Sequence, residues 1–292
     1  MSLARAGLVG PPDMNATPQI FDRTLYCARL ARAGTRGPDI LNRTIASELA
    51  ERLSLITRDF KRACVIAPDP AIIAEAVRQS GRVVVVQEMM PPAAENFGFA
   101  ESEFDAIFNI LDLHAMNDVP GALAQMRRAL APDGLLLAAL FAGDTLTELR
   151  QSWLAGETVA TGGVSPRVSP MISVRELGAL LQRAGLALPV ADLDRTVVRY
   201  ADAVALIHEV HALGMSNMLL GRSRAPVSRR LLGAAANAYH ANFADPDGRI
   251  RATIEIAWLT AWSPHDSQQK PLAPGSAKAR LADALKVPEQ KV

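Results

Sequence analysis

Three polar residues, Asn109, Asp112 and His114, lie at or just beyond the end of the apolar run Phe104 to Leu111. Such a run predicts a strand buried in a sheet, and ligands bind beyond strand ends in open α/β sheets. A free imidazole has a pKa near neutrality, so His114 could act as a base or position a substrate. A loop histidine with a structural hydrogen bond is an equally good interpretation.

A second polar group follows the apolar run Leu135 to Phe141. Asp144 is a candidate catalytic carboxylate, although its position favours capping the helix predicted over Thr145 to Leu154. Glu148 and Arg150 could face the cleft and bind a partner protein as a charged pair. Both interpretations stay open.

His208 and His211 are three residues apart on a predicted helix, a spacing that permits metal binding. No third ligand is evident in the sequence, so packed or solvated histidines are favoured and no metal site is predicted. The sequence also lacks a G-x-S-x-G elbow, a Walker loop and an H-E-x-x-H motif, which leaves hydrolase and NTPase functions without support.

The composition predicts a soluble protein of an interior compartment. Lys plus Arg, 31 residues, nearly balances Asp plus Glu, 30 residues. We therefore expect no overall positive electrostatic field that would attract nucleic acid. Cys27 and Cys64 are isolated, which fits a reducing compartment. No apolar run reaches the ~20 residues needed to span a bilayer. Met1 to Gly10 is too short and broken for a secretory signal and leaves a transit peptide open. We expect a cytoplasmic location, or the mitochondrial matrix in a eukaryote.

Strand and helix patterns alternate along most of the chain. This alternation predicts an α/β fold with a mostly parallel, twisted sheet covered on both faces. The β-branched run Val83 to Val86 is typical of a strand buried on both faces. The predicted helices are Ile40–Leu55, Ala71–Gln79, Val119–Leu130, Thr145–Leu154 and Val174–Ala184. The predicted strands are Ala63–Ala67, Val83–Val86, Phe104–Leu111, Leu135–Phe141, Val190–Tyr200 and Ile250–Trp262.

The mostly helical segment Ala201 to Phe243 interrupts the alternation. We interpret it as an insertion before the last strand that lies over the carboxyl edge of the sheet. A short helix is predicted near the end of the chain, from Ala277 to Leu285. The expected parts of one structural domain are a helical segment (1–58), a Rossmann-like core (59–200), the insertion (201–249) and the final strand with its tail (250–292).

Six short stretches, taken in order, resemble a known family. They are Ile20–Arg23, Asp112–Leu123, Leu130–Gly134, Gly143–Arg150, Gly162–Pro170 and Pro264–Gln268. The chain resembles bacterial relatives of the mitochondrial complex I assembly factor that is built on a class I S-adenosylmethionine (SAM) methyltransferase fold. It is more distantly similar to the malonyl-carrier-protein methyltransferase of biotin synthesis. The resemblance implies SAM at the carboxyl ends of the first two strands and, for the assembly factor, hydroxylation of an arginine in a complex I subunit.

The expected cofactor loop departs from the family pattern, which has an acidic residue followed by glycines. Ala67-Pro68-Asp69-Pro70 contains no glycine, and its two prolines remove two N–H donors. Glu88 is the only candidate for the carboxylate that would hold the ribose hydroxyls, although a solvated turn residue is the alternative. The candidate cofactor-binding residues are Ala67, Asp69, Glu88 and Asn109.

The interval from Met89 to Glu103 reads as loop, whereas the family places a helix, a strand and the adenine-side loop there. Fifteen residues are too few for both elements, so the sheet is expected to be shortened around its third strand. The favoured hypothesis is a pseudoenzyme with weak or no SAM turnover that binds a protein, with Asp112, Glu148 and Arg150 on the partner side. An active SAM-dependent methyltransferase or arginine hydroxylase is the alternative. A structural homologue that dimerises through the insertion helices is a third.

Overall fold

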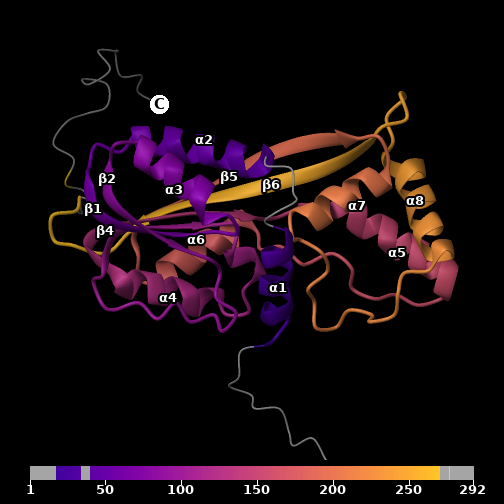
Figure 1. Ribbon diagram of the computed structural model, residues 1–292, viewed down its shortest axis with the longest axis horizontal. Helices are drawn as coiled ribbons and strands as arrows, with labels where there is room; N and C mark the ends of the chain where they lie inside the picture. The colour runs from indigo at the N-terminus through magenta and orange to yellow at the C-terminus, as the bar shows by residue number, and fades with distance from the viewer. Residues whose placement is uncertain (1–17, 34–39, 270–275, 277–292) are drawn as a thin grey trace, which may run out of the picture.

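A computed structural model of the chain describes residues 18–33, 40–269 and 276. The N-terminal stretch 1–10 and the helix predicted over 277–285 lie outside these residues. Six described strands form one sheet in the order β2-β1-β3-β4-β6-β5 (Figure 1). The prediction of an α/β fold with a mostly parallel sheet is confirmed. The strands are β1 (Phe60–Ile66), β2 (Val83–Met89), β3 (Phe104–Ile110), β4 (Leu130–Phe141), β5 (Ala187–Tyr200) and β6 (Ile250–Trp262).

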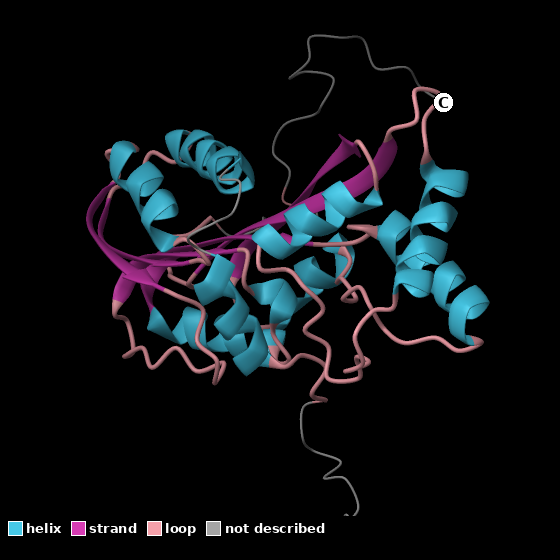
Figure 2. Ribbon diagram, turned by 45° about the vertical axis from the view of Figure 1, so that its right-hand side comes forward, coloured by secondary structure: helices cyan, strands magenta, loops and turns pink. Residues whose placement is uncertain are grey.

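The first four strands run parallel, and β6 is antiparallel to both of its neighbours, β4 and β5. Helices α2 (Ile40–Ser54) and α3 (Pro70–Gln79) cover one face, and α4 (Val119–Ala129) and α6 (Val174–Arg183) cover the other (Figures 1 and 2). Alternate residues of β1 therefore enter two different cores, and residues 63 to 66 are all fully buried.

Local capping explains where several helices begin. The carboxylate of Asp118 accepts from Gly121 N at 2.8 Å at the start of α4. Ser173 and Glu176 form a reciprocal capping box at the start of α6. This helix ends at Gly185, whose φ of +73° suits glycine, as the sequence predicts.

The prediction that Val83 to Val86 is buried on both faces is wrong. β2 is the end strand of the described sheet, and its residues Val84 and Val85 are 79% and 55% exposed. Residues 90–103, which follow β2, form loop and turns and add no strand beside it. The expected shortening of the sheet around the third strand is thus observed, and it leaves β2 uncovered on one side.

The turn predicted at Pro132-Asp133-Gly134 lies inside β4 instead of before it. Asp133 has a φ of +62°, and the pairing of β4 with β3 shifts register between Phe104 and Ala106. A bulge of this kind lets a strand continue through a turn-like sequence. β4 therefore starts at Leu130, five residues before the predicted strand.

Helices α5 (Thr147–Thr161), α7 (Ala203–Ala212) and α8 (Arg229–Phe243) gather beyond the carboxyl ends of the parallel strands (Figure 1). They share a small core with the ends of β5 and β6, which includes Leu149, Leu206 and Tyr239. Gly156 lets α5 approach α8 closely, since a Cβ there would lie 2.6 Å from Ala235 N. Among the described residues, no helix combines the length and apolarity that crossing a membrane requires.

Helix α1 (Arg23–Ala33) lies between the sheet and the α5, α7 and α8 group (Figure 1). The segment before it is fixed to the loop ahead of α8 by an isolated bridge between Phe21 and Leu219. Its place at the centre of the carboxyl edge decides what that edge can bind.

Candidate functional site

The turn between β1 and α3 serves as a helix cap in this structure. The N–H of Ala67 donates to Met89 O at 3.2 Å, so it is used within the sheet. The Asp69 carboxylate accepts from Ile72 N at 3.5 Å and caps α3, while Pro70 occupies the first helical turn. The Ala67 N–H and the Asp69 carboxylate are therefore both used within the chain.

Glu88, the predicted ribose carboxylate, lies near the end of β2. Its Oε1 accepts from Arg78 Nη2 of α3 at 2.5 Å. The ion pair is partly exposed, so it contributes little to stability, but it occupies the carboxylate.

A buried ion pair joins α1 to the loop after β3. Arg23 Nη1 donates to Asp112 Oδ1 at 2.8 Å, and these side chains are 4% and 0% exposed. The other terminal nitrogen of Arg23 donates to Pro92 O, in the loop after β2, at 2.9 Å. One guanidinium therefore ties together the ends of two strands.

Two further residues of α1 contact the same loops directly. The Tyr26 hydroxyl donates to Leu111 O at 2.9 Å, and the Cys27 thiol donates to Pro91 O at 3.2 Å. Direct hydrogen bonds between α1 and the ends of β2 and β3 leave no layer between them. α1 therefore covers this part of the carboxyl edge, above side-chain atoms of Asn109 and His114 that are buried and unpartnered within the described residues.

Burial controls the ionisation of the charged groups at this edge. Burial raises the pKa of Asp112, and the neighbouring Arg23 guanidinium partly offsets that rise. Burial, followed by the positive charge of Arg23, lowers the pKa of His114 to about 3. The His114 imidazole is therefore neutral at pH 7, far from the pKa that suits acid–base catalysis.

The predicted residues around β3 come together at this edge, but they are buried. Asn109 is fully buried in β3, with β1 and β4 on either side. His114 follows in a 3-10 turn, η1 (Leu113–Ala115), where its ring makes edge contacts with Phe141 and Tyr26 at centroid distances of 5.0 and 6.4 Å. The aromatic surroundings hold the imidazole in place.

The capping role predicted for Asp144 is wrong. Helix α5 begins after Leu146, which has a φ of +56° and provides no side-chain cap. The N–H of Asp144 donates to Glu255 Oε2 at 2.7 Å, and its carboxylate is 63% exposed at 3.8 Å from Arg195. This hydrogen bond to Glu255 of β6 holds Asp144 in the turn that precedes the helix.

Glu148 and Arg150 make their contacts within the chain. Glu148 is buried, and its carboxylate accepts from the N–H and the hydroxyl of Thr253 at 3.0 and 2.5 Å. Arg150 Nη2 donates to Ser169 O at 3.2 Å. These groups fix α5 to β6 and to the loop before α6, and their predicted role in partner binding stays a prediction.

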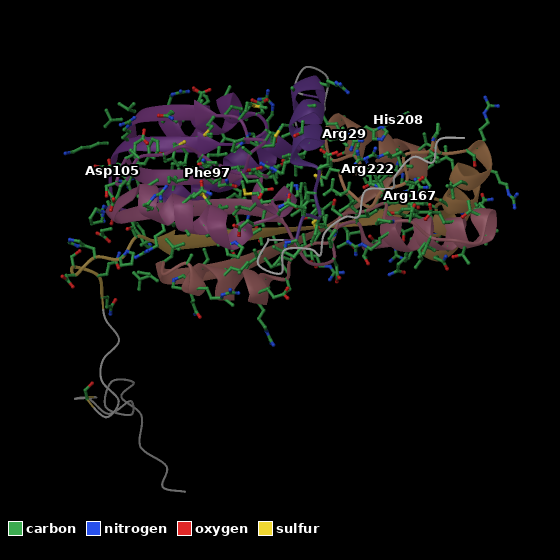
Figure 3. All side chains as sticks on the ribbon, turned by 90° about the horizontal axis from the view of Figure 1, so that it is seen from below. Arg29, Phe97, Asp105, Arg167, His208 and Arg222 are labelled. Atoms are coloured by element: carbon green, nitrogen blue, oxygen red, sulfur yellow. The ribbon has the colours of Figure 1, made fainter. Side chains whose placement is uncertain are left out.

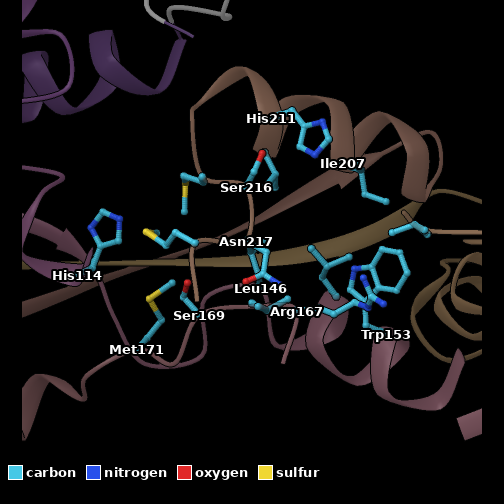
Figure 4. Close-up of a pocket in the computed structure, with 16 residues that line it drawn as sticks. His114, Leu146, Trp153, Arg167, Ser169, Met171, Ile207, His211, Ser216 and Asn217 are labelled. Carbon is cyan, nitrogen blue, oxygen red and sulfur yellow. The ribbon is translucent and has the colours of Figure 1, made fainter. Parts of the chain in front are cut away.

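A pocket of about 150 Å³ lies between η1, α5 and α7 (Figure 4). His114 is at one end and Trp153 at the other, with the methionines Met171, Met215 and Met218 among its lining. Arg167 stacks over the Trp153 ring at 4.9 Å and pairs with Glu157 at 2.5 Å. Flexible methionines and one wide aromatic surface suit an apolar group of a partner molecule.

A larger groove of about 720 Å³ lies above β5 and β6 between α2 and α7. Its floor is apolar and includes Ile254, Ile256 and Trp258, while Glu48 and Glu209 stand on opposite walls. Cavities are therefore present on the β4 and β6 side of the edge.

The loop after α7 is fixed to α1 by two arginines. Arg29 Nη1 donates to Ser216 O at 2.8 Å, and Arg222 Nη2 donates to Asp22 Oδ2 at 3.2 Å. Both lie on the same half of the molecule as Arg167 and His208 (Figure 3). Within the described ranges, no group of three or more His, Cys, Asp or Glu side chains is placed to hold a metal ion.

Residue-type reasoning missed Arg23, Tyr26, Trp153 and Arg167. The first of these belongs to Ile20–Arg23, a stretch that carries the family resemblance without a role assigned to it. An arginine in that stretch and a buried aspartate in the next one could have been paired as opposite charges.

The strand order, with helices on both faces of the sheet, defines a protein with the class I methyltransferase fold. A methyltransferase domain family matches residues 47–138. The chain is 34% identical over 303 residues to arginine-hydroxylase NDUFAF5, mitochondrial, of Rattus norvegicus, covering 95% of this chain and 88% of that protein. It is therefore a member of the NDUFAF5 family.

Two other proteins are similar over less of their sequence or at lower identity. A malonyl-[acyl-carrier protein] O-methyltransferase of Xylella fastidiosa is 34% identical over 171 residues, covering 59% of this chain and 56% of that protein. The solved 1,6-didemethyltoxoflavin-N1-methyltransferase of Burkholderia thailandensis is 15% identical with a TM-score of 0.44, covering 83% of this chain and 88% of that chain.

Proposed function

We propose that this chain acts by binding a protein, a complex I subunit or a component of its maturation machinery, and that it turns over little or no SAM. The observation that carries the proposal is the direct contact of α1 with the ends of β2 and β3. Cys27 donates to the loop after β2, next to the strand ends where the resemblance implies SAM, and Arg23 and Tyr26 donate to the loop after β3.

The other side of the edge supports the protein-binding part of the proposal. Its pocket combines an apolar lining with the half-buried Trp153, and the partner would insert an apolar side chain there. The NDUFAF5 relatives carry the word mitochondrial in their names, and the proposed location of this chain is the cytoplasm, or the mitochondrial matrix in a eukaryote.

The competing proposal is an active enzyme on a protein substrate, either an arginine hydroxylase or a SAM-dependent methyltransferase. The name of the rat relative favours the hydroxylase. Such an enzyme would need its cofactor beside Glu88, which the ion pair with Arg78 and the position of α1 oppose.

Complementation separates the two proposals. In a strain lacking this chain, we expect complex I activity to fall and the wild-type chain to restore it. Asp69→Ala and Glu88→Ala should restore it as well, because neither residue would hold a cofactor. Trp153→Ala should fail although it folds, as judged by thermal melting.

The reverse pattern would contradict the proposal. Failure of Glu88→Ala to restore activity, together with a partner arginine that gains oxygen only with the wild-type chain, would favour the hydroxylase. Unchanged complex I activity in the deletion strain would exclude a complex I subunit or its maturation machinery as the partner.

A further inference from the structure

The end strand β2 presents an open, apolar edge. Among the described strands it pairs with β1 alone, and Val84 and Val85 in its middle are largely exposed. Edge strands of soluble proteins usually carry a charge, a proline or a bulge that discourages pairing with another chain. The four residues 83–86 are all valine, so the middle of this edge has no such protection.

The opposite edge of the sheet shows what a protected edge looks like here. β5 carries four charged residues, and several form ion pairs with neighbouring elements. Asp192 pairs with Arg52, Arg195 with Glu255 and Arg199 with Asp245. The end strand β5 thus carries charges and a proline, whereas residues 83 to 86 of β2 carry neither.

The sequence around β2 is complementary to itself when reversed. In an antiparallel pair centred on Val85, each residue lies opposite the one equally far on the other side of that valine. Val84 then faces Val86 of the second copy, and Arg82 faces Glu88 of the second copy. Valine pairs in the middle and opposite charges at both ends favour this register.

Neighbouring charges extend the complementarity at each end of the ribbon. Arg82 Nη1 lies 3.2 Å from Asp59 Oδ1, and Glu88 lies 2.5 Å from Arg78. In the pair, Asp59 and Arg82 of one copy would adjoin Glu88 and Arg78 of the other. The four charges alternate in sign, which selects the register more than it adds affinity.

We propose that the chain forms a two-fold symmetric homodimer in which the β2 strands pair antiparallel about Val85. The two six-stranded sheets then form one continuous sheet. Two-fold pairing uses both free edges at once and closes the assembly, whereas a head-to-tail arrangement could continue into a filament. This proposal does not depend on the partner protein proposed above.

Charge reversal with mixing tests the proposal. Sedimentation equilibrium of the full chain from about 1 to 100 micromolar should give twice the 31.2 kDa monomer mass at the upper end. Arg82→Glu alone and Glu88→Arg alone should each weaken self-association at least about tenfold, because each creates two like-charge contacts. An equimolar mixture of the two variants should restore the dimer, since both contacts between the unlike copies are attractive.

A second variant and two controls keep the test independent of folding defects. Val85→Lys puts two ammonium groups together on the two-fold axis and should also give a monomer with an unchanged melting temperature. Arg183→Glu on α6 and Glu51→Arg on α2 reverse exposed charges away from β2 and should leave the dimer intact.

Three results would each overturn the proposal. The first is a wild-type chain that stays monomeric at about 100 micromolar, which would leave the edge to a strand of another protein. The second is a dimer that survives Arg82→Glu, Glu88→Arg and Val85→Lys, which would place the interface elsewhere. The third is a mixture of the two charge variants that fails to associate.

Discussion

The carboxyl edge of the sheet differs between its β1 and β2 side and its β4 and β6 side. On the first side, α1 and the turn before α3 both donate to the β2 region, in the bonds from Arg23 to Pro92 O and from Ala67 N to Met89 O. On the second side, polar groups fix α5 to β6, but two cavities stay open to α7. The carboxyl edge therefore has cavities on the β4 and β6 side, whereas α1 covers the β1 and β2 side.

This difference shows that the chain's own first helix can occupy the part of the carboxyl edge above the loops after β2 and β3. Arg23, Tyr26 and Cys27 of α1 donate to the loops after β2 and β3. Beneath them, the side-chain amide of Asn109, Asp112 Oδ2 and both ring nitrogens of His114 are buried without a hydrogen-bond partner among the described residues. Buried polar groups need partners of some kind, and a side chain serves as well as a ligand.

The largest expected effect comes from breaking the contact that closes the first side. Arg23→Met leaves the buried Asp112 carboxylate without its ion-pair partner, and we expect a loss of roughly 3–5 kcal/mol in the free energy of unfolding. Urea unfolding measures it, and Arg32→Met on the exposed face of α1 is the matched control. A loss below about 1 kcal/mol would show that Arg23 does not hold the edge closed.

The second prediction concerns His114, which makes the free energy of unfolding depend on pH. Its pKa is lowered to about 3 in the folded chain, against about 6.5 in an unfolded one. Below pH 6.5 the unfolded state takes up a proton that the folded state does not, so stability falls as the pH drops towards 3. Between pH 7 and pH 5 this contributes a loss of about 2 kcal/mol.

The variant His114→Phe keeps the aromatic packing and should lack that loss. Asp112, whose raised pKa acts in the opposite direction, is present in both proteins, so the difference between them isolates His114. Equal slopes of stability against pH in wild type and variant would contradict the buried, neutral imidazole.

The smallest effect is expected at Asp69, which caps α3. Asp69→Ala should lower stability by about 0.5–1 kcal/mol, because its hydrogen bond to Ile72 N is long. Thermal melting with and without SAM measures both stability and ligand response, with Glu75→Ala on the exposed face of α3 as control. A variant that changes the response to SAM would assign Asp69 to a cofactor site instead of a cap.

Much of the fold could be predicted from local patterns. The β6 bounds, the four helices that cover the sheet and the helical insertion follow from apolar spacing and turn residues, which act over a few positions. The exposure of β2 could not be predicted in this way, because it depends on whether residues 90–103 supply a further strand. The run of valines has the same β propensity at an edge as in the middle of a sheet.

The candidate site was less predictable than the fold for the same reason. Asp112, Asn109 and His114 were placed correctly at a strand end, but their burial depends on α1, about 90 positions earlier in the chain. The predicted cap at Asp144 failed because Glu255, more than 100 positions later, binds its N–H. Contacts over such separations leave no periodic signal in one sequence.

Calorimetric titration of the wild-type chain with SAM and with S-adenosylhomocysteine tests the closed cofactor side most directly. The structure predicts no heat of binding and no rise in melting temperature at about 1 millimolar ligand, whereas a dissociation constant of about 10 micromolar would stabilise the fold by about 2.7 kcal/mol at that concentration. Micromolar binding of either ligand would contradict this account, because α1 would then have to leave the ends of β2 and β3.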